Sequence, residues 1–264
     1  MSFIVNPYIY SSPLCADADG NAFLIATGIT NPTIVSAICT LVTSLKTQGL
    51  WTKIDAIYPF VGGTATTHMY NLKNPANTNA AFRLSFVGGW THSANGALPN
   101  GTNAFANTFY NPNGNASQNS HHVSYYSRTN SNLTEVEVGG VNASQGTVLE
   151  IRTSNITYFR VNSAIVYITA SDADSRAFYI ANRTASNVIN GWRNSIKVAN
   201  GTTSSGTMTS QNYYIGALND NAVTNYYSRK QCAFATIGSG LTDVDAANLY
   251  STIQTFQTTL GRNV

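Results

Sequence analysis

Two glutamates, Glu135 and Glu137, have the residue type and spacing that acid–base chemistry requires. Residues i and i+2 of a β-strand point to the same side of a sheet, so both carboxyl groups are expected on one face. Retaining glycoside hydrolysis uses two carboxyl groups about 5–5.5 Å apart. The alternative is that Val136 and Val138 face the core while the glutamates keep the other face solvated. Two glycines at 139–140 interrupt the row of acids, and we predict a protein that is not an enzyme.

The remaining acidic residues lack the spacing of a metal site. Asp17 and Asp19 resemble the start of a calcium loop, as do Asp172 and Asp174, but the further oxygen ligands at fixed offsets are missing. Turns in which an Asp side chain accepts a backbone hydrogen bond explain both pairs. The adjacent histidines at 121–122 face opposite ways on a strand and cannot chelate one ion together. We therefore expect no metal and no cofactor.

Aromatic residues beside Asn-rich loops are the second kind of candidate. A Tyr or Trp ring offers an apolar face with a polar tip, which suits contact with a sugar or a protein partner. In each Tyr-Tyr pair, alternation along a strand is expected to turn at least one ring away from the core. Rings that line a sheet or a subunit interface are the alternative. The candidate ligand or partner contacts are Trp90, Tyr110, Tyr126, Tyr213 and Tyr227.

Composition indicates a β-rich protein with a neutral, hydrogen-bonding surface. Charged residues make up 9% of the 264 residues, against about 25% in typical globular proteins. Asn, Thr and Ser take their place. The net charge is +3 and the 14 basic residues form no run, which argues against nucleic-acid binding. No apolar run is long enough to cross a bilayer, so no membrane insertion is expected.

The three cysteines, Cys15, Cys39 and Cys232, are odd in number and unrelated in spacing. This pattern predicts reduced, mostly buried thiols in place of a disulfide framework or a zinc site. The first 15 residues have neither the charged start nor the continuous apolar stretch of a signal peptide. Both observations favour folding in a cytoplasm.

A first helix is predicted at about 32–48. Asn31 is a suitable N-cap, and the proline that follows it suits the first helical position. Gly49 ends the apolar periodicity. We expect one face of this helix to pack on the core.

A second helix is predicted at about 243–260. Thr242 and Asp245 have the spacing of a capping box, and Gly261 suits the left-handed position after a helix. The apolar stripe of this helix consists of Val244, Ala247, Tyr250, Ile253, Phe256 and Leu260.

Between the helices, many short apolar runs alternate with turn residues. The runs at 121–127 and 232–238 are typical of strands, and the second is expected to be covered on both faces. Asn190-Gly191 predicts a hairpin turn. Residues 91–120 predict a long loop region with one short strand near 105–110. Together these features predict an all-β sandwich or jelly roll of antiparallel strands, forming one domain at 23–264.

Residues 1–22 are predicted to form an extended arm that includes a polar turn around Asp17, Asp19 and Gly20. The arm is too apolar to be left in water and lacks the periodicity of a core element. We expect it to dock on a neighbouring protein by strand addition, because alternate side chains then fill pockets. An edge strand of the domain's own sheet is the alternative. The candidate docking residues are Phe3, Val5, Tyr8 and Tyr10.

Four segments resemble a module of bacteriophage and other viral structural proteins. They are AIYPFVGGTATTH, AAFRLSFVGGWTHSANGALPNGTNA, SRAFYIANRT and FATIGSGLTDVDAANLY. The likeness runs from about Phe23 to the end of the chain. It implies a concanavalin A-like, laminin-G-like jelly roll of the kind found in tail fibres and other virion surface proteins.

The resemblance also implies a setting and a function. We expect a virion protein, made in the host cytoplasm and exposed on the head or tail, that binds host surface glycans or a partner protein in the manner of a lectin. Other virion proteins are then its partners, and a homo-oligomer is compatible with this setting. A stand-alone lectin or glycoside hydrolase, and a purely architectural protein that cements capsid subunits, remain as alternatives.

Overall fold

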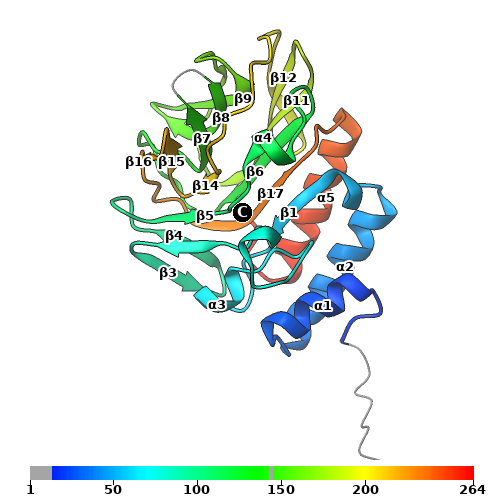
Figure 1. Ribbon diagram of the computed structural model, residues 1–264. Helices are drawn as coiled ribbons and strands as arrows, with labels where there is room; N and C mark the ends of the chain where they lie inside the picture. The colour runs from blue at the N-terminus through cyan, green and yellow to red at the C-terminus, as the bar shows by residue number, and fades with distance from the viewer. Residues whose placement is uncertain (1–13, 143–144) are drawn as a thin grey trace, which may run out of the picture.

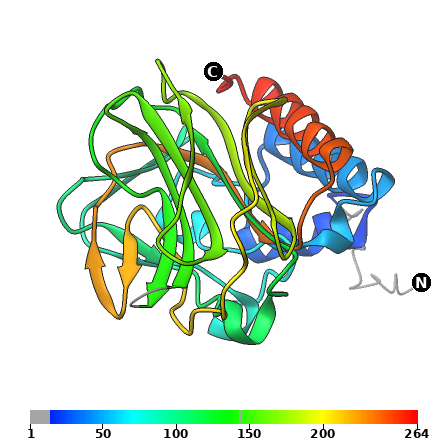
Figure 2. The same ribbon diagram turned by 90° about the horizontal axis from the view of Figure 1, so that it is seen from above.

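The computed structural model describes residues 14–142 and 145–264, so the predicted docking residues Phe3, Val5, Tyr8 and Tyr10 lie outside the described residues. Two β-sheets pack face to face, and helices cover the outer face of one of them. Figure 2 shows this arrangement from above, with the two long helices lying side by side against the sandwich. The predicted all-β sandwich with two long helices is confirmed.

Five α-helices and two 3-10 turns are found in the described residues. The α-helices are α1 (Ala18–Thr27), α2 (Pro32–Thr47), α3 (Ala65–His68), α4 (Pro112–Asn115) and α5 (Asp243–Thr259), and the 3-10 turns are Trp51–Lys53 and Asn79–Ala81.

The first sheet has eight strands, in the order β13-β12-β11-β6-β17-β4-β3, with β1 also paired to β17. Every pairing in it is antiparallel. Its strands are β1 (Ile54–Tyr58), β3 (Trp90–Ser93), β4 (Gly96–Pro99), β6 (His121–Ser127), β11 (Ala177–Ala185), β12 (Val188–Arg193), β13 (Ile196–Gly201) and β17 (Cys232–Gly238).

The second sheet has nine strands, in the order β10-β9-β8-β7-β14-β5-β2, with β15 paired to β7 and β16. The β7–β15 pairing is parallel. Its strands are β2 (Ser85–Val87), β5 (Phe105–Asn107), β7 (Val138–Asn142), β8 (Gln145–Thr153), β9 (Ile156–Ser163), β10 (Ile168–Ser171), β14 (Tyr214–Ile215), β15 (Leu218–Asp220) and β16 (Val223–Asn225). Figure 1 shows both sheets and the helices beside them.

The central strands β6 and β17 of the eight-stranded sheet are buried on both faces. Along β17, Phe234 joins a cluster with the helices, while Ala235 and Ile237 join the cluster between the two sheets. Successive side chains of a strand alternate between faces, so a strand between two packed layers is buried on both faces. The predicted two-sided burial of 232–238 is confirmed, since all seven residues are buried.

Local capping signals predicted both long helices correctly. Asn31 accepts from the backbone N–H groups of Thr33 and Ile34 at the start of α2. At the start of α5, Thr242 and Asp245 form the predicted capping box. Gly261 has a φ of 65° just after this helix, the left-handed value that favours glycine.

The predicted stripe of α5 is partly wrong. Val244 is 68% exposed, whereas Ile253 and Phe256 are buried as expected. Ala246 and Leu249, outside the predicted stripe, are buried too. The buried face includes polar side chains such as Gln257, which apolar periodicity does not detect.

The part of the predicted arm that the structure describes is not extended throughout. Residues 18–22, assigned to a polar turn within the arm, belong to α1, where Asp17 acts as N-cap and accepts from the Asp19 N–H group. Phe23 and Leu24 of this helix are fully buried. Two aspartates near its start suit the helix dipole, so residues that resemble a loop in isolation begin a helix.

Cys15 and Cys39 form a disulfide, with their Cα atoms 5.5 Å apart. The predicted reduced state is therefore wrong for these two residues, because tertiary packing of α1 on α2 brings them together. Cys232 is free and buried, as expected.

Two turn predictions are corrected. Asn190 and Gly191 lie inside β12, and the turns fall at 186–187 and 194–195 instead. Gly191 is needed within the strand because a Cβ atom there would lie 2.5 Å from the Phe159 ring. Residues 91–120 contain the β3–β4 hairpin as well as the expected short strand β5.

Candidate functional site

Glu135 and Glu137 lie directly before β7 and are buried, so the expectation that they solvate an outer face is wrong. They do converge. Lys230, a fully buried residue just before β17, places its Nζ 2.9 Å from Glu135 Oε2 and 3.2 Å from Glu137 Oε1. Because β7 and β17 belong to different sheets, this ion network ties the two layers of the sandwich together.

Each of the four carboxylate oxygens in the network has a partner. Glu137 accepts from the Ile151 N–H group at 2.6 Å and from the Ser228 hydroxyl at 2.9 Å. Glu135 accepts from the Ser131 hydroxyl at 3.3 Å and pairs with Arg229 at 3.4 Å. Buried carboxylates are tolerated when they are paired and hydrogen-bonded in this way.

Burial raises the pKa of Glu137 to about 7, although Lys230 and the Ile151 N–H group act in the opposite direction. For Lys230, burial alone would lower the pKa, but Glu137 and Glu135 outweigh it and the pKa is raised. A raised carboxyl pKa is also found in general acids. Here, however, both glutamates are enclosed by protein and share a lysine, an arrangement that serves stability better than chemistry on a bound sugar.

The second aspartate pair forms the predicted turn, whereas the first caps the start of α1. Asp19 donates its backbone N–H to Asp17, and Asp174 donates its own to Asp172. Lys46 pairs with both members of the first pair. Asp172 accepts from Thr157 and Tyr179, so its carboxylate is occupied by hydrogen bonds within the domain. Within the described parts of the chain, no group of three or more His, Cys, Asp or Glu residues is placed to hold a metal ion.

Three of the five aromatic candidates are buried, which contradicts their predicted role as contacts. Tyr110 and Tyr213 lie between the sheets. Tyr126 does face away from that core, but the other face of its sheet is covered by the helices. Alternation alone therefore could not distinguish a solvated face from a covered one. Tyr227 is half-buried between β16 and β17.

Trp90, like Tyr227, is partly exposed. It lies at the start of β3, the edge strand of the first sheet, and β2 is the edge strand of the second. Around Trp90 we define an aromatic edge of partly exposed rings, which consists of Phe86, Trp90, His92, Phe105 and Tyr214.

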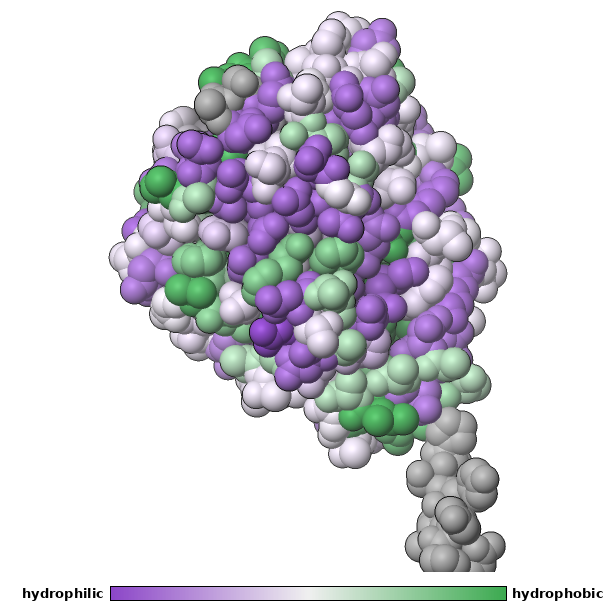
Figure 3. Space-filling view, viewed as in Figure 1, coloured by the Kyte–Doolittle hydropathy of each residue, from purple (hydrophilic) through white to green (hydrophobic). Residues whose placement is uncertain are grey.

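The rings of the aromatic edge contact one another. Phe86 lies 5.3 Å from Trp90 and 4.6 Å from His92, between ring centroids. Phe105 and Tyr214 stack at 4.5 Å with an interplanar angle of 19°. The Trp90 indole N–H donates to the Phe105 carbonyl at 3.3 Å, which connects the two groups. Figure 3 shows hydrophobic residues gathered at the lower left of this face, over the region of β4 and β5, among hydrophilic ones.

An asparagine-rich loop is fixed beside this edge. Asn100 accepts from the backbone N–H groups of residues 102–104 and donates to Asn103. Asn103 in turn accepts from the Gly89 N–H group. Gly88 must be glycine, since its φ is 77° and a Cβ atom would lie 2.1 Å from the Asn103 carbonyl oxygen. Gly88 and Gly89 thus allow the exposed residues Asn100 and Asn103 to lie next to the rings.

His68 is a buried neighbour that the sequence did not reveal. Its Nδ1 lies 2.9 Å from Nδ1 of His92, so one of the two rings donates to the other. Burial lowers the pKa of His68 to about 3 and also lowers that of His92. Both rings are therefore neutral near pH 7, and no charge is added to the aromatic edge.

A pocket lies elsewhere in the described residues. It has a volume of about 560 Å³ and lies between the α1–α2 corner and the segment around Val61 and Thr67. Its lining is uncharged. The Thr27 and Thr67 hydroxyls already donate to backbone carbonyls. A pocket with few convergent polar groups gives a ligand little orientation, so we prefer the aromatic edge as the candidate site.

No family model matches the chain, and no curated protein matches it. Among solved structures, the chain is similar to one of botulinum neurotoxin type C, with 14% identity and a TM-score of 0.52 over 69% of this chain and 50% of that chain. NanB sialidase of Streptococcus pneumoniae is matched at 11% identity and a TM-score of 0.41, over 50% of this chain and 24% of that chain. The CBM40 domain of Ruminococcus gnavus IT-sialidase is matched at 11% identity and a TM-score of 0.38, over 50% of this chain and 82% of that chain.

The chain thus spans about a quarter of the length of the NanB sialidase. The likeness to the botulinum neurotoxin structure shows the fold, an antiparallel jelly-roll sandwich of the lectin-like kind, as predicted. In the described residues, no helix is long and apolar enough to cross a membrane.

Proposed function

We propose that this protein is a non-catalytic binding module that recognises cell-surface glycans at its aromatic edge. The observation that carries the proposal is the group of partly exposed rings around Trp90, next to the exposed residues Asn100 and Asn103, whose side-chain oxygens accept hydrogen bonds within the loop. Aromatic faces suit the apolar faces of sugar rings, and amides suit their hydroxyl groups.

A jelly roll alone does not fix a function. Cell entry of botulinum neurotoxin type C depends on interaction with two ganglioside molecules, so a sandwich of similar fold belongs to a glycolipid-binding protein in that case. For this chain, the ligand class rests on the aromatic edge and on a surface with few charged residues.

The proposed setting is the surface of a bacteriophage or other virus. Its support is the resemblance of four segments to modules of virion proteins. The Cys15–Cys39 disulfide adds a second argument, because disulfides persist in oxidising surroundings and are rare in a reducing cytoplasm. In this setting the partners are other virion proteins and host glycans.

A glycan array tests the proposal. We expect the purified full chain to bind a restricted set of glycans and to release no reducing sugar from them. Release of reducing sugar would favour a glycoside hydrolase and contradict the non-catalytic assignment. Absence of binding across a broad array would favour the purely architectural alternative.

A further inference from the structure

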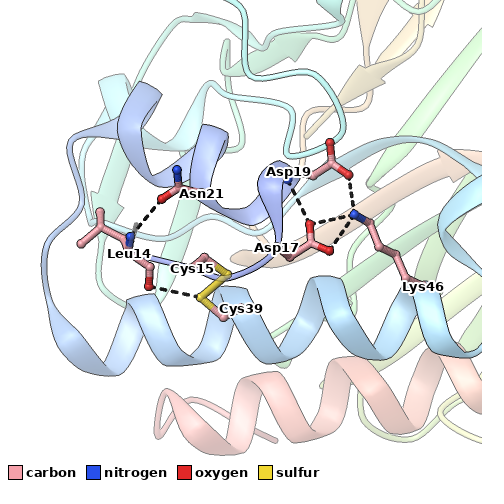
Figure 4. Close-up of a disulfide and its surroundings, with 7 residues drawn as sticks. All are labelled: Leu14, Cys15, Asp17, Asp19, Asn21, Cys39 and Lys46. Carbon is pink, nitrogen blue, oxygen red and sulfur yellow. Dashed lines mark hydrogen bonds and ion pairs between the residues drawn. A yellow bond between two sulfur atoms is a disulfide. The ribbon is translucent and has the colours of Figure 1, made fainter. Parts of the chain in front are cut away.

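The start of the described chain is fastened to the domain by a covalent bond as well as by packing. Cys15 lies three residues before α1, and Cys39 lies in the middle of α2. Figure 4 shows the disulfide bridging the segment before α1 to α2, with Leu14 beside it. The segment before α1 is therefore joined covalently to α2, which packs on the core through Ile38, Leu41 and other residues.

Apart from the disulfide, the segment at 14–17 is held by the burial of Cys15, by a hydrogen bond from the Leu14 N–H group to Asn21, and by ion pairs. Lys46 pairs with Asp17 at 2.7 Å and with Asp19 at 2.6 Å, but all three side chains are partly exposed. Ion pairs of this kind contribute little to stability in water. The second half of α1 is held independently, because Phe23 and Leu24 are fully buried.

The two bonded cysteines differ in exposure to solvent. Cys15 is buried, whereas Cys39 is half-buried on α2. A thiolate from solvent therefore reaches Cys39 Sγ more easily, and Cys15 is the leaving group. The third cysteine, Cys232, is fully buried within β17.

We propose that the Cys15–Cys39 disulfide is a thiol-cleavable anchor that holds residues 14–17 on α2. Cleavage of this bond releases the segment while the jelly roll stays folded. The cleaving partner is a dithiol reductant. Its first thiolate attacks Cys39 Sγ, the S–S bond breaks, and Cys15 leaves as a thiolate that takes up a proton. The second thiol of the reductant then closes on the mixed disulfide and releases Cys39. Two electrons pass to the protein, and the reductant becomes a disulfide. This inference does not rest on glycan binding.

Native-state alkylation of the full chain tests the anchor, with Cys232 as an internal reporter of unfolding. Iodoacetamide is expected to add no group to the untreated protein, two groups after dithiothreitol, and the third only in denaturant. Alkylation of Cys15 or Cys39 before reduction would show that the bond is absent. Failure to label them after dithiothreitol would show that it is not cleavable in the folded state. Labelling of Cys232 without denaturant would show that the whole domain opens.

Hydrogen exchange locates the released segment. After dithiothreitol, we expect amide exchange at residues 14–19 to rise at least tenfold while exchange in β17 stays unchanged. The variant Cys39→Ser should show the fast exchange without reductant. The matched control, Cys232→Ser, should keep slow exchange at residues 14–19 until dithiothreitol is added. Equal exchange in the two variants would overturn the proposal.

Discussion

Lys230 Nζ lies 2.9 Å from Glu135 Oε2, although the two residues are buried and 95 positions apart in the sequence. Together with Glu137, they form a charged network inside a protein that has few charges. Removing one partner of a buried ion network leaves the others uncompensated, which is costly.

The variant Lys230→Met is therefore expected to lower the free energy of unfolding by about 3–5 kcal/mol. Chemical denaturation measures this loss. Arg229→Gln is the matched control, because the Arg229 side chain is 50% exposed, and a loss below about 1 kcal/mol is expected there. Equal losses in the two variants would mean that the buried lysine has no special role.

The pKa of Glu137, raised by burial to about 7 from an ordinary 4.5, gives a pH dependence of known sign. The folded state binds more protons than the unfolded state between these values, so this contribution to stability is present below pH 4.5 and is lost as the pH rises through about 7. Between pH 4.5 and about 7, the free energy of unfolding of the natural protein should fall by up to about 3 kcal/mol relative to that of Glu137→Gln. Denaturant titrations at several pH values measure the difference.

Two buried histidines change the stability with pH in the opposite direction. Burial lowers the pKa of His122 to about 4 and that of His121 to about 3, so their contribution is lost as the pH falls below about 6.5. Both histidines are also present in the Glu137→Gln variant. Their contribution therefore cancels when the free energy of unfolding of the variant is subtracted from that of the natural protein. Parallel stability curves from pH 4.5 to 7 would contradict the assignment to Glu137.

Features that depend on residues close together in the sequence could be predicted, whereas features that depend on residues far apart in the sequence were missed. The Thr242–Asp245 capping box is local and was predicted correctly. The burial of Tyr126 depends on helices that cover its sheet from both ends of the sequence. Lys230 carried no short-range signal, since its two partners lie more than 90 positions away.

The closing helix is expected to be essential to the fold. Phe256 is buried, and its ring lies 5.6 Å from that of Phe234 on β17. Phe256→Ala should lower the free energy of unfolding by about 3–5 kcal/mol, as for other large-to-small changes in a core. Val244→Ala, on the exposed face of the same helix, should change it by less than about 0.5 kcal/mol. A small loss for Phe256→Ala would mean that α5 is peripheral.

Deletion of residues 2–12 tests the proposed docking arm. The deletion ends before the buried Cys15 and its disulfide to α2, so the truncated protein should fold and stay soluble. In the proposed virion setting, we expect it to be absent from particles, as measured by its amount in purified particles. Aggregation or loss of the thermal transition would place the segment in the core instead.

The most direct test of glycan recognition at the aromatic edge is the affinity of a glycan identified by array, measured by calorimetry with the natural protein and with Tyr214→Ala. Tyr214 is partly exposed and stacks on Phe105, so its loss should weaken binding about tenfold, which corresponds to about 1.4 kcal/mol. Tyr250→Ala, on α5 in the helical layer, is the matched control and should bind like the natural protein. Unchanged affinity in Tyr214→Ala, or an equal loss in both variants, would contradict glycan recognition at this edge.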